Sequence, residues 1–206
     1  YSLSLILKND KKEKTIFWFL LYTSLTLLIS GFLLVFFKLF YLLIFGALFF
    51  IFLTTYILLL KTKRDRTTFG EILSIFGLSM SSPLAYYLTT GKLDGLAFIL
   101  WFLNFSYFSG SVFYVKLKLG ILYKRDILRR RALNLTYHII LLTFLIFLAF
   151  WELIPTFSPI AYIPMLSKTL TESFEKRPIS SLRKLGFSEF FHSILFASLL
   201  TLSFHL

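Results

Sequence analysis

The sequence contains no cysteine, and few of its residues carry a negative charge. Without cysteine there is no disulfide framework, and no thiolate can act as a nucleophile or as a metal ligand. The chain also lacks a glycine-rich phosphate-binding loop, an H-E-x-x-H pair and a G-x-S-x-G serine elbow. The sequence alone therefore assigns no catalytic residues.

No secretory signal peptide is recognisable at the amino end, because no basic segment precedes a short apolar core and a small-residue cleavage site. Residues Tyr1–Leu7 are apolar but too few to cross about 30 Å of hydrocarbon. We expect them to be the end of a helix whose beginning precedes Tyr1, followed by a charged loop at Lys8–Lys14.

Apolar residues are abundant instead. They make up 57% of the chain, aromatic residues make up 20% and charged residues only 16%, with a mean hydropathy of +0.79. Soluble domains are about 45–50% apolar and about 25% charged, so this composition predicts an integral membrane protein. The net charge of +12 lies in short loops between apolar segments, which indicates membrane topology and argues against nucleic-acid binding.

The predicted fold class is all-α, a polytopic transmembrane helical bundle formed by one domain over residues 1–206. A spanning helix needs about 20 mostly apolar residues. We expect Pro83 to kink the third span and Pro164 to break the sixth. The seven predicted spans cover about 15–37, 39–60, 71–89, 96–115, 135–151, 157–171 and 187–206.

The basic residues predict the orientation. All of the 22 Lys and Arg except Lys38 and Lys92 fall in alternate connections between the predicted spans. Short cytoplasmic loops are enriched in Lys and Arg. The sequence therefore predicts basic loops in the cytoplasm and an external carboxyl terminus, with Lys124–Arg131 as an interfacial helix.

The fourth predicted span carries a polar stripe. Asn104, Tyr107, Ser111, Tyr114 and Lys118 follow one another at spacings of three and four residues, which places them on one side of a helix of about 3.6 residues per turn. The stripe leads into the basic segment that follows.

Polar groups inside a membrane are costly, so they mark either a functional site or hydrogen bonds between helices. The predicted orientation allows several of them to converge on a cytoplasm-facing cavity with a basic rim. Such a cavity suits a phosphate or carboxylate head whose apolar tail lies between the helices. Alternatively, the basic loops only contact anionic lipid non-specifically. The candidate substrate-binding residues are Lys61, Lys63, Arg64, Glu71, Asn104, Ser111, Tyr114, Lys116, Lys118, His138, Glu189 and His192.

Glu189 and His192 form an E-x-x-H pair, which on a helix can offer two ligands to one metal ion. Carboxylate-bridged metal sites need a second such pair, and the sequence has none. We therefore expect no metal site.

Two stretches carry a family resemblance: Lys63–Pro83 (KRDRTTFGEILSIFGLSMSSP) and Arg177–Phe196 (RPISSLRKLGFSEFFHSILF). Through their K-R-x-R-x-x-x-G-E, R-P-I-S and L-G-x-x-E-x-x-x-S elements, the sequence resembles the YwiC-like family of bacterial membrane proteins, over most of its length. The resemblance implies a bacterial inner-membrane location and no established reaction. Members usually carry at least one further amino-terminal helix, opening with a Glu-His-Gly motif, so it also implies that this part is missing here.

More distantly, the topology resembles that of UbiA-type prenyltransferases, which have nine helices and a cytoplasmic active mouth. The seven spans would be their third to ninth, and LLKTKRDRTTFGE is similar to the basic segment after their fourth helix. Those enzymes hold magnesium diphosphate with two Asp-rich motifs. Here the first motif's position offers only Asp10 and Glu13, and the second offers Lys116 and Lys118. No magnesium cofactor is therefore expected, and the lysines would hold a phosphate directly.

The leading functional hypothesis is a membrane protein that binds an amphiphile with an anionic head, a membrane lipid or an isoprenoid-type molecule. One alternative is a non-catalytic subunit or assembly partner of a larger membrane complex, suggested by the aromatic-rich helices between Phe17 and Phe52. The other alternative is an atypical UbiA-like prenyltransferase.

Overall fold

In the computed structural model, residues 12–174 and 182–205 are described, and the side chains of residues 12–15 and 182 are not. The described residues form helices and no strand, which confirms the all-α fold class. The predictions for Tyr1–Leu7, for the start of the Lys8–Lys14 loop and for the R-P-I-S element lie outside these residues. The chain divides into two compact units, residues 1–101 and 102–206, and each is described by itself.

Several of the helices have the length and composition of membrane spans, so the chain is a multi-pass integral membrane protein. Those among the described residues are Ile16–Phe37, Tyr41–Lys61, Thr68–Thr90, Gly95–Tyr123, Ile127–Phe150 and Arg183–Ser203.

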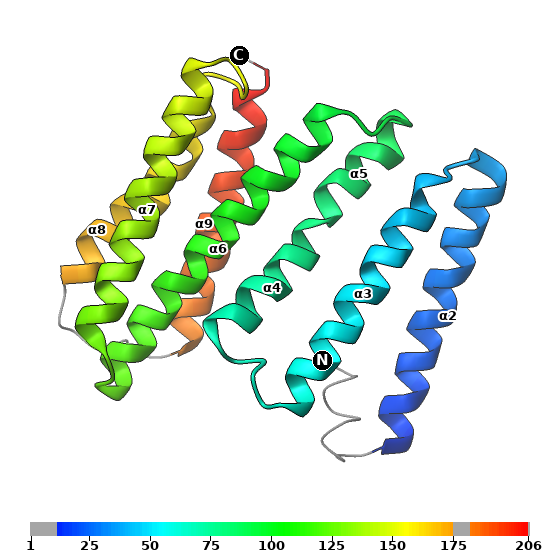
Figure 1. The fold of residues 1–206 in the computed structure, drawn as a ribbon, viewed down its shortest axis with the longest axis horizontal. Helices are drawn as coiled ribbons and strands as arrows, with labels where there is room; N and C mark the ends of the chain where they lie inside the picture. The colour runs from blue at the N-terminus through cyan, green and yellow to red at the C-terminus, as the bar shows by residue number, and fades with distance from the viewer. Residues whose placement is uncertain (1–11, 175–181, 206) are drawn as a thin grey trace. The chain divides into compact units, whose positions relative to one another are not determined.

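Unit 1 begins with the helices α2 (Lys12–Phe37) and α3 (Tyr41–Lys61), which form a hairpin through a turn at Lys38 (Figure 1). Neither helix has a buried residue among its described side chains. Both are apolar on every side, as expected for helices that contact lipid or another apolar surface around their whole circumference.

A basic turn connects α3 to α4 (Thr68–Ser79). Thr67 caps α4, because its hydroxyl oxygen accepts a hydrogen bond from the backbone N–H of Gly70 at 3.1 Å. A Cβ atom at Gly70 would lie only 2.6 Å from the carbonyl oxygen of Arg64 and 2.8 Å from that of Asp65. The turn therefore folds back onto the first turn of α4, where only glycine fits.

The third predicted span is interrupted at Met80, between α4 and α5 (Ser81–Thr90). Pro83 explains the break, because proline has no N–H to donate to the carbonyl of Ser79 and its ring crowds that carbonyl. Gly77 packs against Phe52 of α3. A Cβ atom added at Gly77 would lie 3.4 Å from the Phe52 ring, which is ordinary van der Waals contact, so the two helices pack directly against each other here.

Unit 2 consists of the Phe102–Tyr123 part of α6 (Gly95–Tyr123), α7 (Ile127–Phe150), the 3-10 turn η1 (Ser158–Tyr162) with α8 (Ile163–Phe174), and α9 (Leu182–Ser203) (Figure 1). Its core is aromatic. The ring of Tyr107 stacks on that of Phe196, with 3.8 Å between centroids and 11° between planes. The ring of Tyr162 meets Phe196 edge-on at 5.2 Å, and its hydroxyl donates to the carbonyl of Leu103 at 2.7 Å.

The seven predicted spans are not confirmed as a count, because the segment predicted at 157–171 is η1 followed by the 12-residue α8. Pro159 and Pro164 lie where a longer continuous helix would need their N–H groups. The segment nevertheless crosses unit 2, since Ser158 bonds Ser203 at the end of α9 (3.2 Å between hydroxyl oxygens) and Glu172 pairs with Lys118 near the end of α6.

The boundary between α6 and α7 also differs from the prediction. Instead of ending near Val115, α6 continues to Tyr123, and only Lys124–Asp126 separate it from α7. The helix tolerates the charge of Lys118 because this lysine pairs with a carboxylate inside the unit. Arg130 of α7 links the two helices by donating to the backbone carbonyl of Lys116 at 2.8 Å. The basic segment is thus mostly helical.

Candidate functional site

The polar stripe of α6 faces the interior of unit 2. Tyr107, Tyr114 and Lys118 are at most 4% exposed, while Asn104 and Ser111 are half-buried. The stripe therefore meets the side chains that α8 and α9 present, and a cluster of charged residues lies at that contact.

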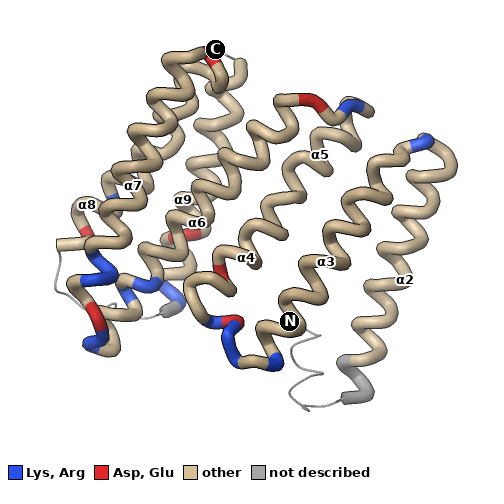
Figure 2. Tube along the Cα trace, viewed as in Figure 1, with Lys and Arg blue, Asp and Glu red and all other residues tan. Residues whose placement is uncertain are grey.

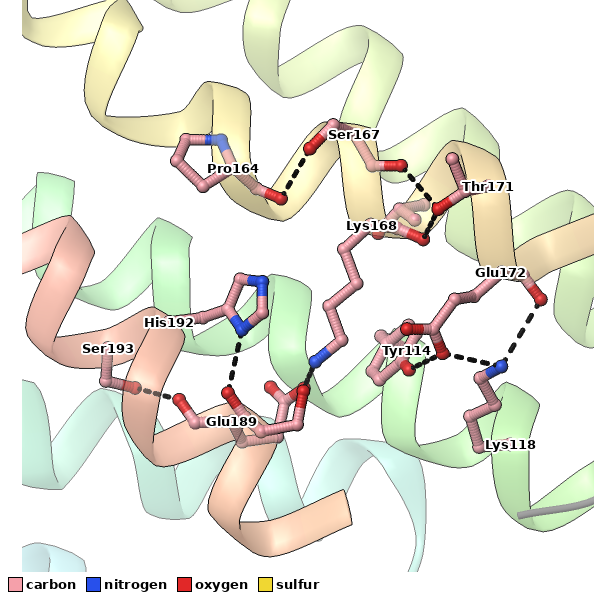
Figure 3. Close-up of polar contacts among 12 residues, drawn as sticks. Tyr114, Lys118, Pro164, Ser167, Lys168, Thr171, Glu172, Glu189, His192 and Ser193 are labelled. Atoms are coloured by element: carbon pink, nitrogen blue, oxygen red, sulfur yellow. Dashed lines mark hydrogen bonds and ion pairs between the residues drawn. The ribbon is translucent and has the colours of Figure 1, made fainter. Parts of the chain in front are cut away.

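Glu172 on α8 links two residues of the stripe (Figure 3). Its carboxylate accepts a hydrogen bond from the Tyr114 hydroxyl and pairs with the Lys118 ammonium, with 2.7 Å between Nζ and Oε2. The same ammonium lies 3.4 Å from the backbone carbonyl oxygen of Glu172. The side chain of Lys118 is 5% exposed and that of Glu172 is 33% exposed, so the cation is the more deeply buried partner.

A second ion pair lies beside the first. The Lys168 ammonium extends from α8 to the carboxylate of Glu189 on α9 (Figure 3). It also lies over the ring of Tyr114, 4.3 Å from the centroid, so Tyr114 contacts both lysine–glutamate pairs. The second carboxylate oxygen of Glu189, Oε2, is buried and has no hydrogen-bond partner among the described residues.

These contacts determine the charge state of Glu172. This residue comes directly after the sixth predicted span, which ends at residue 171. Burial raises the pKa of the Glu172 carboxyl. Hydrogen bonds from Lys118 and Tyr114, with the charges of Lys118 and Lys168, outweigh burial and hold that pKa below its ordinary value. The group is therefore an anion at neutral pH, and the cluster holds two cations and at least one carboxylate.

His138 is a buried residue of α7 that contacts α8 beside Lys168. Its Nδ1 bonds the carbonyl oxygen of Asn134 at 2.8 Å, so Nδ1 carries the proton and Nε2 is free to accept. Nε2 lies 3.5 Å from the Thr169 hydroxyl and borders a cavity of about 10 Å³, roughly the volume that one water molecule needs. Gly110 and Tyr162 also line this cavity.

The structure brings some of the predicted site residues together and not others. Tyr114, Lys118 and Glu189 belong to the charged cluster. On α9, the Nδ1 atom of His192 bonds the carbonyl oxygen of Ser188 within its own helix, at 2.7 Å. The predicted residues Lys61, Lys63, Arg64 and Glu71 all lie in unit 1, so their convergence with the unit 2 residues stays a prediction.

Two members of the cluster, Lys168 and Glu172, are absent from the predicted site. In the predicted orientation Lys168 is one of the basic residues of a cytoplasmic connection, although the sixth predicted span, 157–171, contains it; in the structure it is buried in α8. A signal for both is present in the sequence. Polar residues recur at helical spacing in α8, and the buried ones include Lys168, Thr169 and Ser173.

In the part of the chain that the structure describes, the side chains that could bind a metal ion do not cluster in space. Among the described residues, no three His, Cys, Asp or Glu side chains lie close enough together to hold one ion.

Positive charge is concentrated in one half of unit 2, the half where α6 and α8 end and α7 and α9 begin (Figure 2). The opposite half carries Glu152 and, in the described part of the chain, neither Lys nor Arg. The basic residues of this half, called the basic end below, are Lys116, Lys118, Lys124, Arg125, Arg129, Arg130, Arg131, Lys168, Arg183 and Lys184.

Comparison with known protein families gives one match, which covers part of the chain. Residues 1–86 match the family model described as YwiC-like protein. The match confirms the resemblance at Lys63–Pro83, whereas Arg177–Phe196 lies outside the matched residues. No curated protein and no solved structure matches the chain, so the UbiA-like topology stays a prediction.

Proposed function

We propose that this multi-pass membrane protein, whose residues 1–86 match the YwiC-like family model, binds an amphiphile with an anionic, phosphate-like head at the basic end of unit 2. The amphiphile is a membrane lipid or an isoprenoid-type molecule. The proposal assigns no reaction.

The excess of positive charge at the basic end carries the proposal. Glu172 and Glu189 neutralise Lys118 and Lys168, and Asp126 is the other acidic residue described in this half. The remaining lysines and arginines therefore leave this end strongly positive. An anionic head placed there gains charge-assisted hydrogen bonds from lysine and arginine without requiring a divalent cation.

An apolar surface for the tail adjoins these charges. On α9, Phe187, Phe190 and Phe191 follow Arg183 and Lys184 within two helical turns, and all three phenylalanines are more than 60% exposed. A head held by the basic residues would place its tail along these rings. We propose that the basic end faces the cytoplasm of a bacterial inner membrane, because short cytoplasmic segments are enriched in Lys and Arg.

The test is the lipid that co-purifies with the protein in mild detergent. We expect the double variant Lys116→Ala with Lys184→Ala to lose a specific anionic amphiphile seen by mass spectrometry in the wild-type protein. The arginine double variant at the same two positions should retain it. Unchanged lipid content in the alanine variant would contradict the proposal.

A matched control separates a specific site from general attraction to anionic lipid. The variant Lys124→Ala with Arg125→Ala removes the same charge from the exposed turn of the same end. We expect it to retain the amphiphile. Equal losses in both variants would show that only the overall charge matters, which is the non-specific alternative.

A second candidate function is assembly with another membrane protein, and the exposure of α2 and α3 favours it. These helices bury no described side chain within their unit and expose many aromatic rings, including Phe36, Phe49 and Phe50. Such surfaces suit either lipid or a partner helix. Purification in gentle detergent should then give a particle larger than the monomer, and a monomer alone would count against this candidate.

A further inference from the structure

We infer that Tyr114 and Lys118, with the charge of Lys168 beside them, form an anion site that the Glu172 carboxylate fills, and that an external oxyanion takes this site by displacing Glu172. The inference rests on the proposed function and deepens it, because it names the residues that hold the anionic head and assigns Glu172 as its internal competitor.

The three residues have the features of a built site. Their exposed fractions are 1% for Tyr114, 4% for Lys118 and 6% for Lys168, so their orientations are fixed by packing. Tyr114 supplies a hydroxyl donor and Lys118 an ammonium group to the carboxylate. The Lys168 ammonium pairs with Glu189 and adds positive charge beside them, since it lies 4.3 Å from the Tyr114 ring centroid. Burial strengthens the attraction that such donors exert on an anion.

Glu172 is the residue of the charged cluster whose side chain can move out of the anion site. Its side chain is 33% exposed, so its carboxylate can regain water when it moves away, whereas the side chain of Lys118 is only 5% exposed and its ammonium cannot. Glu172 also lies near the end of α8, which is too short to span a membrane by itself. Lys168 keeps its own partner, Glu189, when Glu172 leaves.

The contacts of Glu172 describe the chemistry of the group that replaces it. Its carboxylate accepts from the Tyr114 hydroxyl and pairs with the Lys118 ammonium. A carboxylate or a phosphate monoester offers oxygens in a similar spacing, and it restores the charge balance that Lys118 requires. The site therefore suits a compact oxyanion with an accessible terminal oxygen pair.

Chemical rescue tests the inference in the full-length protein solubilised in detergent. The variant Glu172→Ala removes the internal carboxylate and leaves Lys118 without its carboxylate partner. We expect added acetate to raise the melting temperature of this variant saturably, with chloride balancing the ionic strength. The midpoint should lie at least about tenfold below any midpoint in the wild-type protein, the ratio that about 1.4 kcal/mol of competition produces.

The double variant Glu172→Ala with Lys118→Met is the matched control. It lacks the cation that attracts the anion, so acetate should not stabilise it. Equal responses to acetate in the single and double variants, or no response in the single variant, would overturn the inference. If Glu172→Ala does not fold, Glu172→Ser serves the same purpose, because its short side chain also vacates the position of the carboxylate, and the same two outcomes apply.

Two further probes identify the source of the oxyanion. Inorganic phosphate and phosphatidic acid in mixed micelles share the phosphate chemistry, but only the second has acyl chains. Stronger stabilisation of Glu172→Ala by the lipid supports a lipid head group, and equal stabilisation supports a free phosphate. Loss of the amphiphile in the Lys116 and Lys184 variant without acetate rescue at Glu172 would reject this inference and leave the proposed function standing.

Discussion

The Lys118 ammonium on α6 and the Glu172 carboxylate on α8 form an ion pair with 2.7 Å between Nζ and Oε2, and the two partners differ in burial. Lys118 is 5% exposed, whereas Glu172 is 33% exposed. Removing one partner therefore has a different cost for each: a lysine left alone is buried, whereas a glutamate left alone is accessible to water.

We predict that Glu172→Ala destabilises the protein more than Lys118→Met does. The first variant leaves a buried ammonium without its carboxylate, at a cost of about 3 kcal/mol. The second leaves a carboxylate that water can reach, at a cost of about 1 kcal/mol. Unfolding of the detergent-solubilised variants by titration with a denaturing detergent measures both values, and a reversed order would contradict the burial argument.

The pKa of Glu172 predicts an acid-sensitive contribution to stability. Because its pKa is lower in the folded protein than in the unfolded chain, its stabilising effect is complete above the unfolded value, about 4.3, and is lost as the pH falls through the folded-state pKa. We expect the melting temperature of the wild-type protein to decrease more steeply below about pH 4.5 than that of Glu172→Gln. Parallel curves for the two proteins would disprove this contribution.

A glycine lets α6 and α7 approach each other. A Cβ atom at Gly110 would lie 3.0 Å from Nε2 of His138 and 3.3 Å from the Tyr137 ring. We predict that Gly110→Ala costs about 1–3 kcal/mol of unfolding free energy. Gly186→Ala is the control, because nothing lies within 4 Å of its Cβ position and alanine favours a helix by up to about 1 kcal/mol.

The aromatic core of unit 2 depends on Phe196, which is 1% exposed and stacks on Tyr107. We predict that Phe196→Ala lowers the unfolding free energy by about 3–5 kcal/mol, since it removes the stacked ring and leaves a cavity. Phe191 on the same helix is 65% exposed, so Phe191→Ala should change stability little. Similar losses in the two variants would show that the stacking is not specific.

The fold class follows from composition and from runs of apolar residues, because a bilayer admits few other structures for such a sequence. The bounds of α3 and the break before Pro83 also agree with expectation, since each depends on local signals: a run without charges and a residue without an N–H. The polar stripe already places Lys118 on the same helix as Tyr114, but its burial could not be predicted, because it depends on a carboxylate 54 residues later.

The sequence predicts the candidate site only in part. Helical spacing places Tyr114 and Lys118 on one face of α6, but it does not indicate what that face meets. Lys168 counts among the basic residues of a predicted cytoplasmic connection, because positive charge marks cytoplasmic loops, although the structure buries it opposite Glu189. Pairing across helices depends on packing, which no local pattern contains.

The contact of Gly70 with the carbonyl oxygens of Arg64 and Asp65 bears on the K-R-x-R-x-x-x-G-E element that begins at Lys63. Because only glycine fits where the backbone folds back, this element has a structural role. It holds the turn that carries its arginines against the start of α4. A methyl group at position 70 would clash with both carbonyl oxygens, so Gly70→Ala should force the basic turn away from the start of α4.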